Sequence, residues 1–114
     1  MKVQALENTL KNSGFQEDPL DSGCNYIKKV GHITFICYVE PGIEVEFIVI
    51  YQWKNNDVKG AHNISLNELS RSHQPIETFF RLAKNDMPPY VGEFTDTHDE
   101  VEKAIGTIQW HNDL

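Results

Sequence analysis

The sequence predicts an α+β fold in which helices pack on a small antiparallel sheet. Residues 32–53 contain two runs of β-branched and aromatic residues around Pro41-Gly42, which is typical of two strands joined by a turn. Before and after this region, apolar residues recur at the spacing of amphipathic helices. The expected order is one helix, three strands and then three helices, and this segregation favours an α+β architecture over alternating parallel units.

With 114 residues the chain is long enough to bury a single core, and it contains no internal repeat, linker or low-complexity tract. We therefore expect one domain over residues 1–114. Its sheet is expected to have three strands, or four if a short extended segment joins it. An N-terminal helix and two to three C-terminal helices are expected to pack on this sheet.

The first element is an amphipathic helix over residues 2–12, where Leu6 and Leu10 share one face. Gly14 suits the position just past the helix end, because glycine adopts the left-handed backbone conformation needed there. The following segment, residues 16–23, is polar and contains a proline, and it is therefore predicted to be a loop.

Strands are predicted over residues 25–30, 33–39 and 45–53, which are rich in valine, isoleucine, phenylalanine and tyrosine. Asparagine, aspartate and glycine between residues 55 and 60 predict a turn. A short extended segment over residues 61–64 is the candidate fourth strand.

The hydrophobic pattern predicts the register of the two central strands. If Pro41, Gly42 and Ile43 form an odd-numbered loop, the apolar side chains of both strands share one face; an even loop would mix them with Glu44 and Glu46, whose burial is costly. The shared face then comprises Ile33, Phe35, Cys37, Val39, Val45, Phe47, Val49 and Tyr51.

The opposite face of the same hairpin is also apolar in its middle. It comprises Thr34, Ile36, Tyr38, Ile48 and Ile50, with Glu40, Glu44 and Glu46 at the turn end. Such a face needs a cover, which either the helices of this chain or another molecule can supply.

Helix starts are marked by two capping boxes and a proline. Ser65 with Glu68 predicts a short helix through residues 69–72, and Thr97 with Glu100 predicts the start of the C-terminal helix. Pro75 suits the first turn of the helix between them. The apolar stripes of the last two helices comprise Ile76, Phe79, Phe80 and Ala83, and Val101, Ala104, Ile105 and Ile108.

Composition excludes several classes of function. The formal charge is −7, from 17 acidic and 10 basic residues, and it disfavours direct nucleic-acid binding. Arg71 and Arg81 are the only arginines, so few side chains can bind phosphate in a bidentate manner. No apolar run is long enough to span a membrane and the start lacks a signal-peptide core, so the expected location is the cytoplasm.

No metal, cofactor or catalytic motif is present. The five histidines form no HExxH, HxH or histidine–CxxC arrangement. His98 lies beside two aspartates, which is typical of a solvated first helical turn. Cys37 is expected to be a core residue, whereas Cys24 would need an adjacent base and cation to act as a nucleophile, for which Lys28, Lys29 and His32 are the candidates.

Acidic residues cluster at positions 17–21, 40–46 and 93–102, and none of these clusters has calcium-binding spacing. They form either a solvated surface or a face that docks on a basic partner. Aromatic residues at the ends of elements are suitable interface anchors. The residues predicted to form a protein interface are Ile36, Tyr38, Glu44, Glu46, Ile48, Ile50, Trp53, Tyr90 and Trp110.

The leading hypothesis is a non-catalytic domain that binds a protein partner, with homodimerisation through the apolar sheet face as one form of it. Short chains without motifs are common among phages and other mobile elements, which makes an inhibitor, immunity or accessory role the leading guess within this class. The alternatives are a small enzyme with a site near Cys24 or His98, and a ligand-binding protein with a cavity lined by Phe79, Phe80 and Tyr51.

Overall fold

A computed structural model describes residues 3–40, 44–53, 56–65, 68–69, 71, 75–87 and 97–111, except for the side chains of Glu44, Trp53, Asn56 and Pro75. The main elements are α1 (Val3–Asn12), β1 (Gln16–Pro19), β2 (Cys24–Val30), β3 (Ile33–Glu40), β4 (Glu44–Trp53), β5 (Asn56–Ile64), α3 (Pro75–Asn85) and α4 (Thr97–Thr107). They form one antiparallel sheet with helices, which confirms the predicted α+β class.

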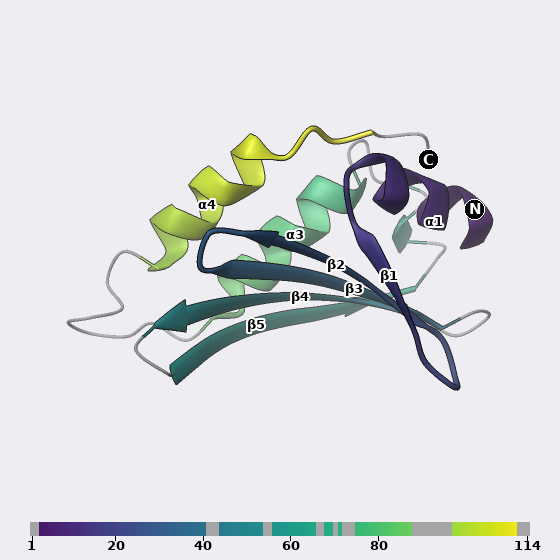
Figure 1. Cartoon of the computed structure of the whole chain (residues 1–114), viewed down its shortest axis with the longest axis horizontal. Coiled ribbons are helices and arrows are strands. Elements are labelled where there is room, and N and C mark those ends of the chain that lie inside the picture. The colour runs from purple at the N-terminus through teal and green to yellow at the C-terminus, as the bar shows by residue number, and fades with distance from the viewer. Residues whose placement is uncertain are drawn as a thin grey trace.

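The sheet has five strands in the order β1-β2-β3-β4-β5, so every strand pairs with its neighbours in sequence. This sheet therefore has more strands than the three or four that were predicted. Figure 1 shows α1, α3 and α4 on the same side of this sheet. Helix α3 packs on β4 and β5, and α4 packs on α3. The described residues therefore form a helical layer on one face of a sheet, and the core lies between the two.

The predicted register of the central hairpin is confirmed. Ile33 is paired with Tyr51 and Val39 with Val45, so residues 41–43, which lie outside the described residues, connect the strands as an odd-numbered loop. Along β3 the side chains alternate strictly between buried and partly exposed. The apolar set of both strands thus faces the helices, as the cost of burying Glu46 requires.

The prediction of a loop over residues 16–23 is wrong for its first half, because Gln16–Pro19 forms strand β1. All four residues are exposed, and Gln16 is paired with Ile27 and Pro19 with Cys24. This edge strand has no apolar alternation, so its pairing with β2 stabilises it rather than its own propensity. Pro19 is tolerated because it lies at the end of an edge strand.

The turn predicted between residues 55 and 60 is also wrong, since β5 begins at Asn56 and runs through Gly60 to Ile64. Its pairing extends from Trp53 opposite Asn56 to Val45 opposite Ile64. Only Val58 and Ile64 are buried apolar residues in it, which explains the weak pattern. Gly60 has a packing role, described below.

The end of α1 follows the prediction made for Gly14. Gly14 has a φ of 91°, which is the left-handed region. The amide of Phe15 donates to the carbonyl of Leu10 at 3.0 Å, and the amide of Gly14 donates to that of Lys11 at 3.0 Å. These two bonds define a Schellman motif, and they direct the chain from α1 into β1 with Phe15 buried.

The two capping predictions have different outcomes. Ser65 Oγ accepts a hydrogen bond from the amide of Glu68 at 3.2 Å, as predicted. Thr97 Oγ1 is buried and has no hydrogen-bond partner among the described residues, so its predicted bond to the amide of Glu100 is not formed. Helix α4 nevertheless begins at Thr97.

An aromatic cluster joins the sheet to the helical layer. The ring centroid of Phe80, on α3, lies 5.2 Å from those of Phe35 and Phe47 in edge-to-face geometry. It also lies 5.6 Å from those of Phe15 and Trp110. One side chain therefore contacts β3, β4, the end of α1 and the segment after α4, each at a separation favourable for aromatic pairs.

Gly60 allows α3 to approach β5 more closely than any side chain would permit. A Cβ at this position would overlap the carbonyl oxygen of Ala83. Because that oxygen belongs to the helix backbone, the overlap cannot be relieved by a rotamer change. A glycine that looks unfavourable for a strand is thus required for helix–sheet packing.

We predict that Gly60→Ala lowers the free energy of unfolding by about 1–3 kcal/mol, the usual cost of overpacking a core. The matched control is Gly106→Ala on α4, where a Cβ would meet no atom within 4 Å. That control should be neutral or stabilise the protein by up to about 1 kcal/mol, since alanine is the better helix former. Urea denaturation of both variants measures these changes in stability. Equal stability of Gly60→Ala and Gly106→Ala would contradict the close packing of α3 against Gly60.

Candidate functional site

The face of the sheet turned away from the helices is the strongest candidate site. We call it the outer sheet face. Its side chains are exposed or only partly buried, whereas those of the opposite face form the core. Its central residues are Ile27, Ile36, Ile48, Ile50 and Ala61, and its polar residues include Asp18, Asn25, Lys29, Thr34, Tyr38, Glu40, Glu46, Asp57, Lys59 and Asn63.

A row of apolar side chains crosses four strands of this face. Ile27 is paired with Ile36, Ile36 with Ile48, and Ile48 with Ala61. Ile50 is the next outward residue of β4. Residues directly opposite on neighbouring strands have Cβ atoms about 5 Å apart, so these side chains contact one another. They form one continuous apolar strip, in which Ile36, Ile48 and Ile50 are partly exposed.

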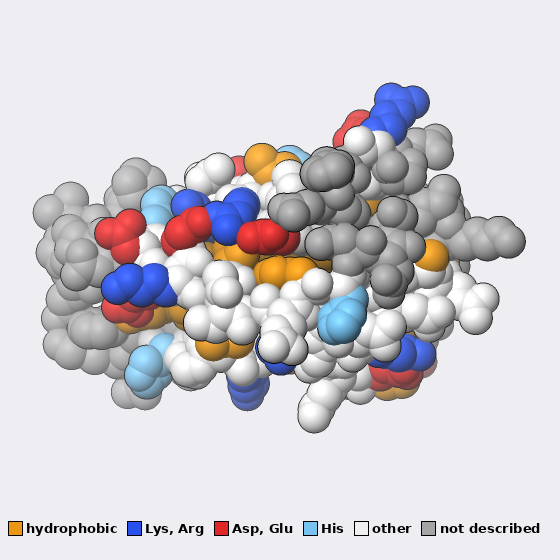
Figure 2. Space-filling model, turned by 90° about the horizontal axis from the view of Figure 1, so that it is seen from above, with side chains coloured by type: hydrophobic (Ala, Val, Ile, Leu, Met, Phe, Trp, Pro, Cys, Tyr) orange, Lys and Arg blue, Asp and Glu red, His pale blue; other side chains and the backbone are white. Residues whose placement is uncertain are grey.

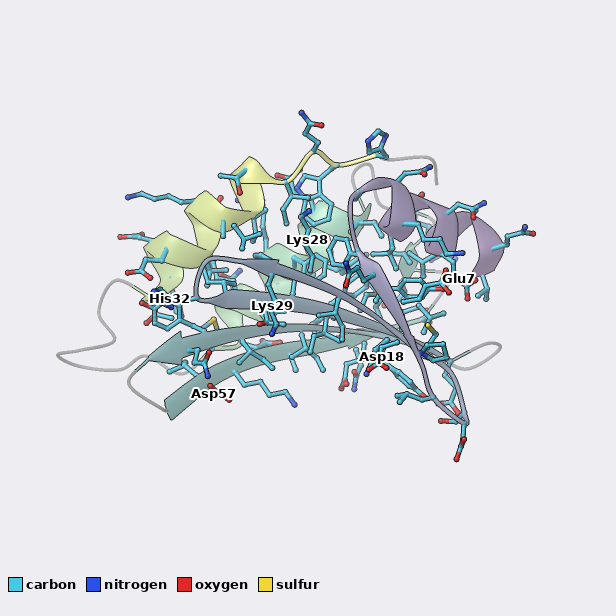
Figure 3. The ribbon with its side chains drawn as sticks, viewed as in Figure 1. Glu7, Asp18, Lys28, Lys29, His32 and Asp57 are labelled. Atoms are coloured by element: carbon cyan, nitrogen blue, oxygen red, sulfur yellow. The ribbon has the colours of Figure 1, made fainter. Side chains whose placement is uncertain are left out.

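Charged residues of opposite sign lie on the two sides of this strip. On one side, Lys29 and Lys59 are the outward residues of β2 and β5, in the row that contains Thr34 and Ile50. On the other side, the row of Tyr38 contains Asp18 and Glu46. Figure 3 shows Lys29 and Lys28 on opposite sides of the sheet, with Lys28 towards the helices.

Further acids lie beyond both rows. Glu40 is next to the acidic row, near the connection of β3 to β4, and Asp57 lies beyond Lys59 at the start of β5. The outer sheet face is therefore an apolar strip between an acidic row and a basic row, with Asp57 at the rim of the basic end.

Tyr38 is held in place by the hairpin that connects β1 to β2. Its hydroxyl lies 2.7 Å from Ser22 Oγ, and a Cβ at Gly23 would lie 3.0 Å from that hydroxyl. The same Cβ would overlap the carbonyl oxygen of Val39. Glycine at this position thus lets the hairpin that connects β1 to β2 pack against Tyr38. This packing fixes the Tyr38 side chain at one end of the outer sheet face.

The predicted interface residues are not all in one place. Ile36, Tyr38, Glu46, Ile48 and Ile50 share the outer sheet face. The backbone of Glu44 extends this set, but its side chain, that of Trp53 and the whole of Tyr90 lie outside what the structure describes.

Trp110 lies on the helix side. Its ring packs on those of Phe15 and Phe80, and its Nε1 donates a hydrogen bond to the carbonyl of Ile105 at 3.0 Å. This side chain is partly buried against the core. It therefore anchors the segment after α4, away from the outer sheet face.

Cys24 and His98 do not share a site. Cys24 is paired with Val39, at the end of the sheet where β3 joins β4. The first turn of α4, which contains His98, lies at the other end, since Glu100 of α4 borders a hollow with Val30. The seven residues of β2 separate these ends by about 20 Å.

The thiols have different environments. Cys37 is fully buried, and burial raises the pKa of its thiol well above the ordinary value. Cys24 is partly exposed, and its Sγ lies 3.4 Å from the carbonyl of Asn25. Burial, followed by a hydrogen bond with Cys24, raises the pKa of the Tyr26 hydroxyl. Burial therefore keeps the Cys37 thiol and the Tyr26 hydroxyl in their neutral forms rather than activating them.

The space between the sheet and α3 is filled by aromatic rings. Phe79 stacks on Phe47 with a centroid distance of 5.4 Å, and Phe80 contacts Phe35 and Phe47 as described above. Tyr51 is buried in the same core. The residues proposed to line a ligand cavity thus pack against other core residues.

A shallow hollow of about 300 Å³ lies between α4 and the turn that connects β2 to β3. Val30, Ile33 and Ala104 form its floor, and His32, Glu100 and Lys103 border it.

Within the described part of the chain, no group of three or more histidine, cysteine, aspartate or glutamate side chains is arranged to hold a metal ion.

The helix side of the molecule has a different character. Figure 2 views that side and shows acidic and basic side chains next to one another over the helical layer. Arg81 Nη2 lies 2.8 Å from Glu77 Oε1, Lys84 Nζ lies 3.1 Å from Glu102 Oε2, and Arg81 also pairs with Glu102. These four charges are thus paired with one another, and the two pairs with Glu102 link α3 to α4.

No family model, curated protein or solved structure matches this chain. Among the described residues no helix is long and apolar enough to cross a membrane.

The sequence reasoning missed four contributors to the outer sheet face: Ile27, Ala61, Lys29 and Lys59. Ile27 and Lys29 alternate with Tyr26 and Lys28 in β2, so the period of two in that strand was a usable signal. Lys59 had no such signal, because residues 55–60 were predicted to form a turn, and Ala61 was only the first residue of the short extended segment predicted over residues 61–64.

The raised pKa of Cys37 predicts how stability depends on pH. The unfolded thiol ionises near pH 8.5, whereas the folded one stays protonated, so the stability present below about pH 8.5 falls as pH rises above it. We expect this loss to approach about 1.4 kcal/mol per pH unit before Tyr26 contributes above about pH 10.

Urea denaturation between pH 7 and pH 10 checks this prediction. Cys37→Ala should have a shallower fall than the wild type, whatever its absolute stability. Cys24→Ala leaves Cys37 in place and should keep the fall. Parallel profiles for the wild type and Cys37→Ala would show that the thiol of Cys37 is not responsible.

Proposed function

We propose that this chain is a non-catalytic protein-binding domain and that the outer sheet face is its docking surface. The observation that carries this proposal is the apolar strip of Ile27, Ile36, Ile48 and Ala61, which the helical layer does not cover because α1, α3 and α4 all lie on the other face.

The physical basis is the free energy of exposed apolar surface. Each square ångström of apolar surface removed from water contributes about 25 cal/mol. On the outer sheet face the isoleucines are contiguous rather than scattered, which is typical of interaction surfaces. Lysines and acids surround them, as in the apolar centre and polar rim of protein interfaces.

The rigidity of the site supports the same proposal. The three central strands hold the isoleucines by backbone pairing along their full lengths, and Tyr38 is fixed by Ser22. A preorganised face loses little conformational entropy on binding. This site therefore suits a role in which it blocks a surface of another protein or forms a complex with it, as in an inhibitor, an immunity protein or an accessory factor.

We predict that the double variant Ile36→Thr/Ile48→Thr loses its protein partner. Threonine keeps the β-branched shape that the strands favour but places a hydroxyl in the apolar strip. Each loss of about 1.4 kcal/mol of binding free energy weakens the complex tenfold, so we expect a loss of affinity of tenfold or more.

The matched control is Val30→Thr. Val30 is also a partly buried, β-branched strand residue, but it lies on the helix side of the sheet. The wild type, Ile36→Thr/Ile48→Thr and Val30→Thr are compared by quantitative capture from extracts of the source cells. Each purified interactor is then titrated against the three proteins. Interactors bound equally by the wild type and by Ile36→Thr/Ile48→Thr would exclude the outer sheet face as the docking surface.

A further inference from the structure

We propose that the occupant of the outer sheet face is a second copy of this chain, stacked face to face with its strands antiparallel to those of the first. This inference rests on the proposed function and names the partner of the same surface. It is carried by the distribution of charge on the two sides of the apolar strip.

The outer sheet face has a charge polarity along the strand direction. The basic row contains Lys29 and Lys59, both exposed. The acidic row contains Asp18, which is exposed, and Glu46, which is partly exposed. The described ion pairs involve none of these four side chains. Their charges are therefore available to a partner.

In a symmetric face-to-face dimer the twofold axis lies in the plane between the sheets, and its two limiting directions are parallel and perpendicular to the strands. With an axis parallel to the strands, each row faces the same row of the second copy. Lys29 and Lys59 would then face lysines, and the acids would face acids, which is unfavourable. Electrostatic repulsion therefore disfavours this stacking.

In the other case the axis is perpendicular to the strands and runs along the row of Ile36 and Ile48. The strands of the second copy then run opposite to those of the first, and each strand lies over the same strand of the second copy. The acidic row then faces the basic row. Glu46 on β4 lies beside Lys59 on β5 of the second copy, and Asp18 on β1 lies beside Lys29 on β2 of the second copy. By symmetry each pair occurs twice.

The dimensions fit this arrangement. Stacked sheets are about 10 Å apart, a gap that a lysine and a carboxylate side chain extending from opposite sides can span. The two isoleucine rows then meet at the centre, as in the aligned packing of two-sheet proteins. Asp57 lies at the rim beyond Lys59, where its charge is screened by solvent.

The area of the face indicates a dimer of modest affinity. Five strands at a spacing of about 4.8 Å, with about eight residues of about 3.3 Å each, give a face of about 600 Å². Two such faces bury about 1,200 Å² in total, at the lower limit of specific interfaces. We therefore expect a dimer that dissociates in the micromolar range.

A charge exchange between Glu46 and Lys59 tests the stacking. The full-length chain is studied by sedimentation velocity from about 1 to 500 μM as the wild type, Glu46→Lys, Lys59→Glu, and the double variant with both changes. Each single variant replaces two attractive pairs by two repulsive pairs, so we expect dimerisation to weaken about tenfold. The double variant restores both pairs and should dimerise nearly as well as the wild type.

Lys103→Glu is the control for net charge. Lys103 is exposed on α4, on the helix side, so this variant changes the charge of the chain as Lys59→Glu does without altering the outer sheet face. It should dimerise as the wild type does. Circular dichroism of each variant verifies that the fold is retained.

The outcomes separate this inference from the proposed function. A wild-type chain that stays monomeric up to 500 μM overturns the inference, while the capture experiment with Ile36→Thr/Ile48→Thr still decides the proposed function. A dimer weakened by both single variants but not restored in the double variant overturns the antiparallel stacking. A dimer that persists in the charge variants and in Ile36→Thr/Ile48→Thr forms elsewhere and also overturns the inference.

Discussion

The packing of Phe80 against both central strands is the interaction on which the rest of this structure depends. Its ring contacts Phe35 on β3 and Phe47 on β4, and on its other sides Phe15 and Trp110. Because these contacts hold the end of α1, helix α3 and the segment after α4 on one face of the sheet, the described inward side chains of β3 and β4 are all buried. The ion pairs of Arg81 and Lys84 with Glu102 add a link between α3 and α4, at a surface where such pairs are individually weak.

One-sided packing has a direct consequence for the other face. Side chains of a strand alternate between faces, so fixing Phe35 and Phe47 in the core directs Ile36 and Ile48 outwards. The strands therefore present apolar side chains on a surface that no described helix covers. The proposed docking role rests on an imbalance between two apolar sheet faces and the single layer formed by the described helices.

The central hairpin could be predicted because two constraints agree there. Its residues favour strands, and only an odd-numbered loop keeps Glu46 out of the core. Strands β1 and β5 could not be predicted in the same way. Gln16–Pro19 has no apolar alternation and depends on β2, whereas Gly60, which weakens a strand, is needed because α3 packs against it. Both strands are products of tertiary packing rather than of local sequence.

The candidate site was likewise predictable in part. Ile36, Ile48 and Ile50 were placed on one face by the period of two. Whether the helices would also cover this second face was not predictable, because it depends on contacts between Phe80 and residues distant in sequence. The contribution of Lys29 and Lys59 also required the pairing of all five strands.

The accessibility of the isoleucine methyl groups in dilute protein tests the central claim most directly. With selectively labelled isoleucine methyl groups and a soluble paramagnetic agent, nuclear magnetic resonance measures the solvent-induced relaxation of each methyl group. Strong relaxation is expected for Ile36, Ile48 and Ile50, and protection for the buried Ile33, Ile76 and Ile105. Equal protection of all six in a sample shown to be monomeric would mean that the chain covers both faces of its own sheet, and would rule out an exposed outer sheet face.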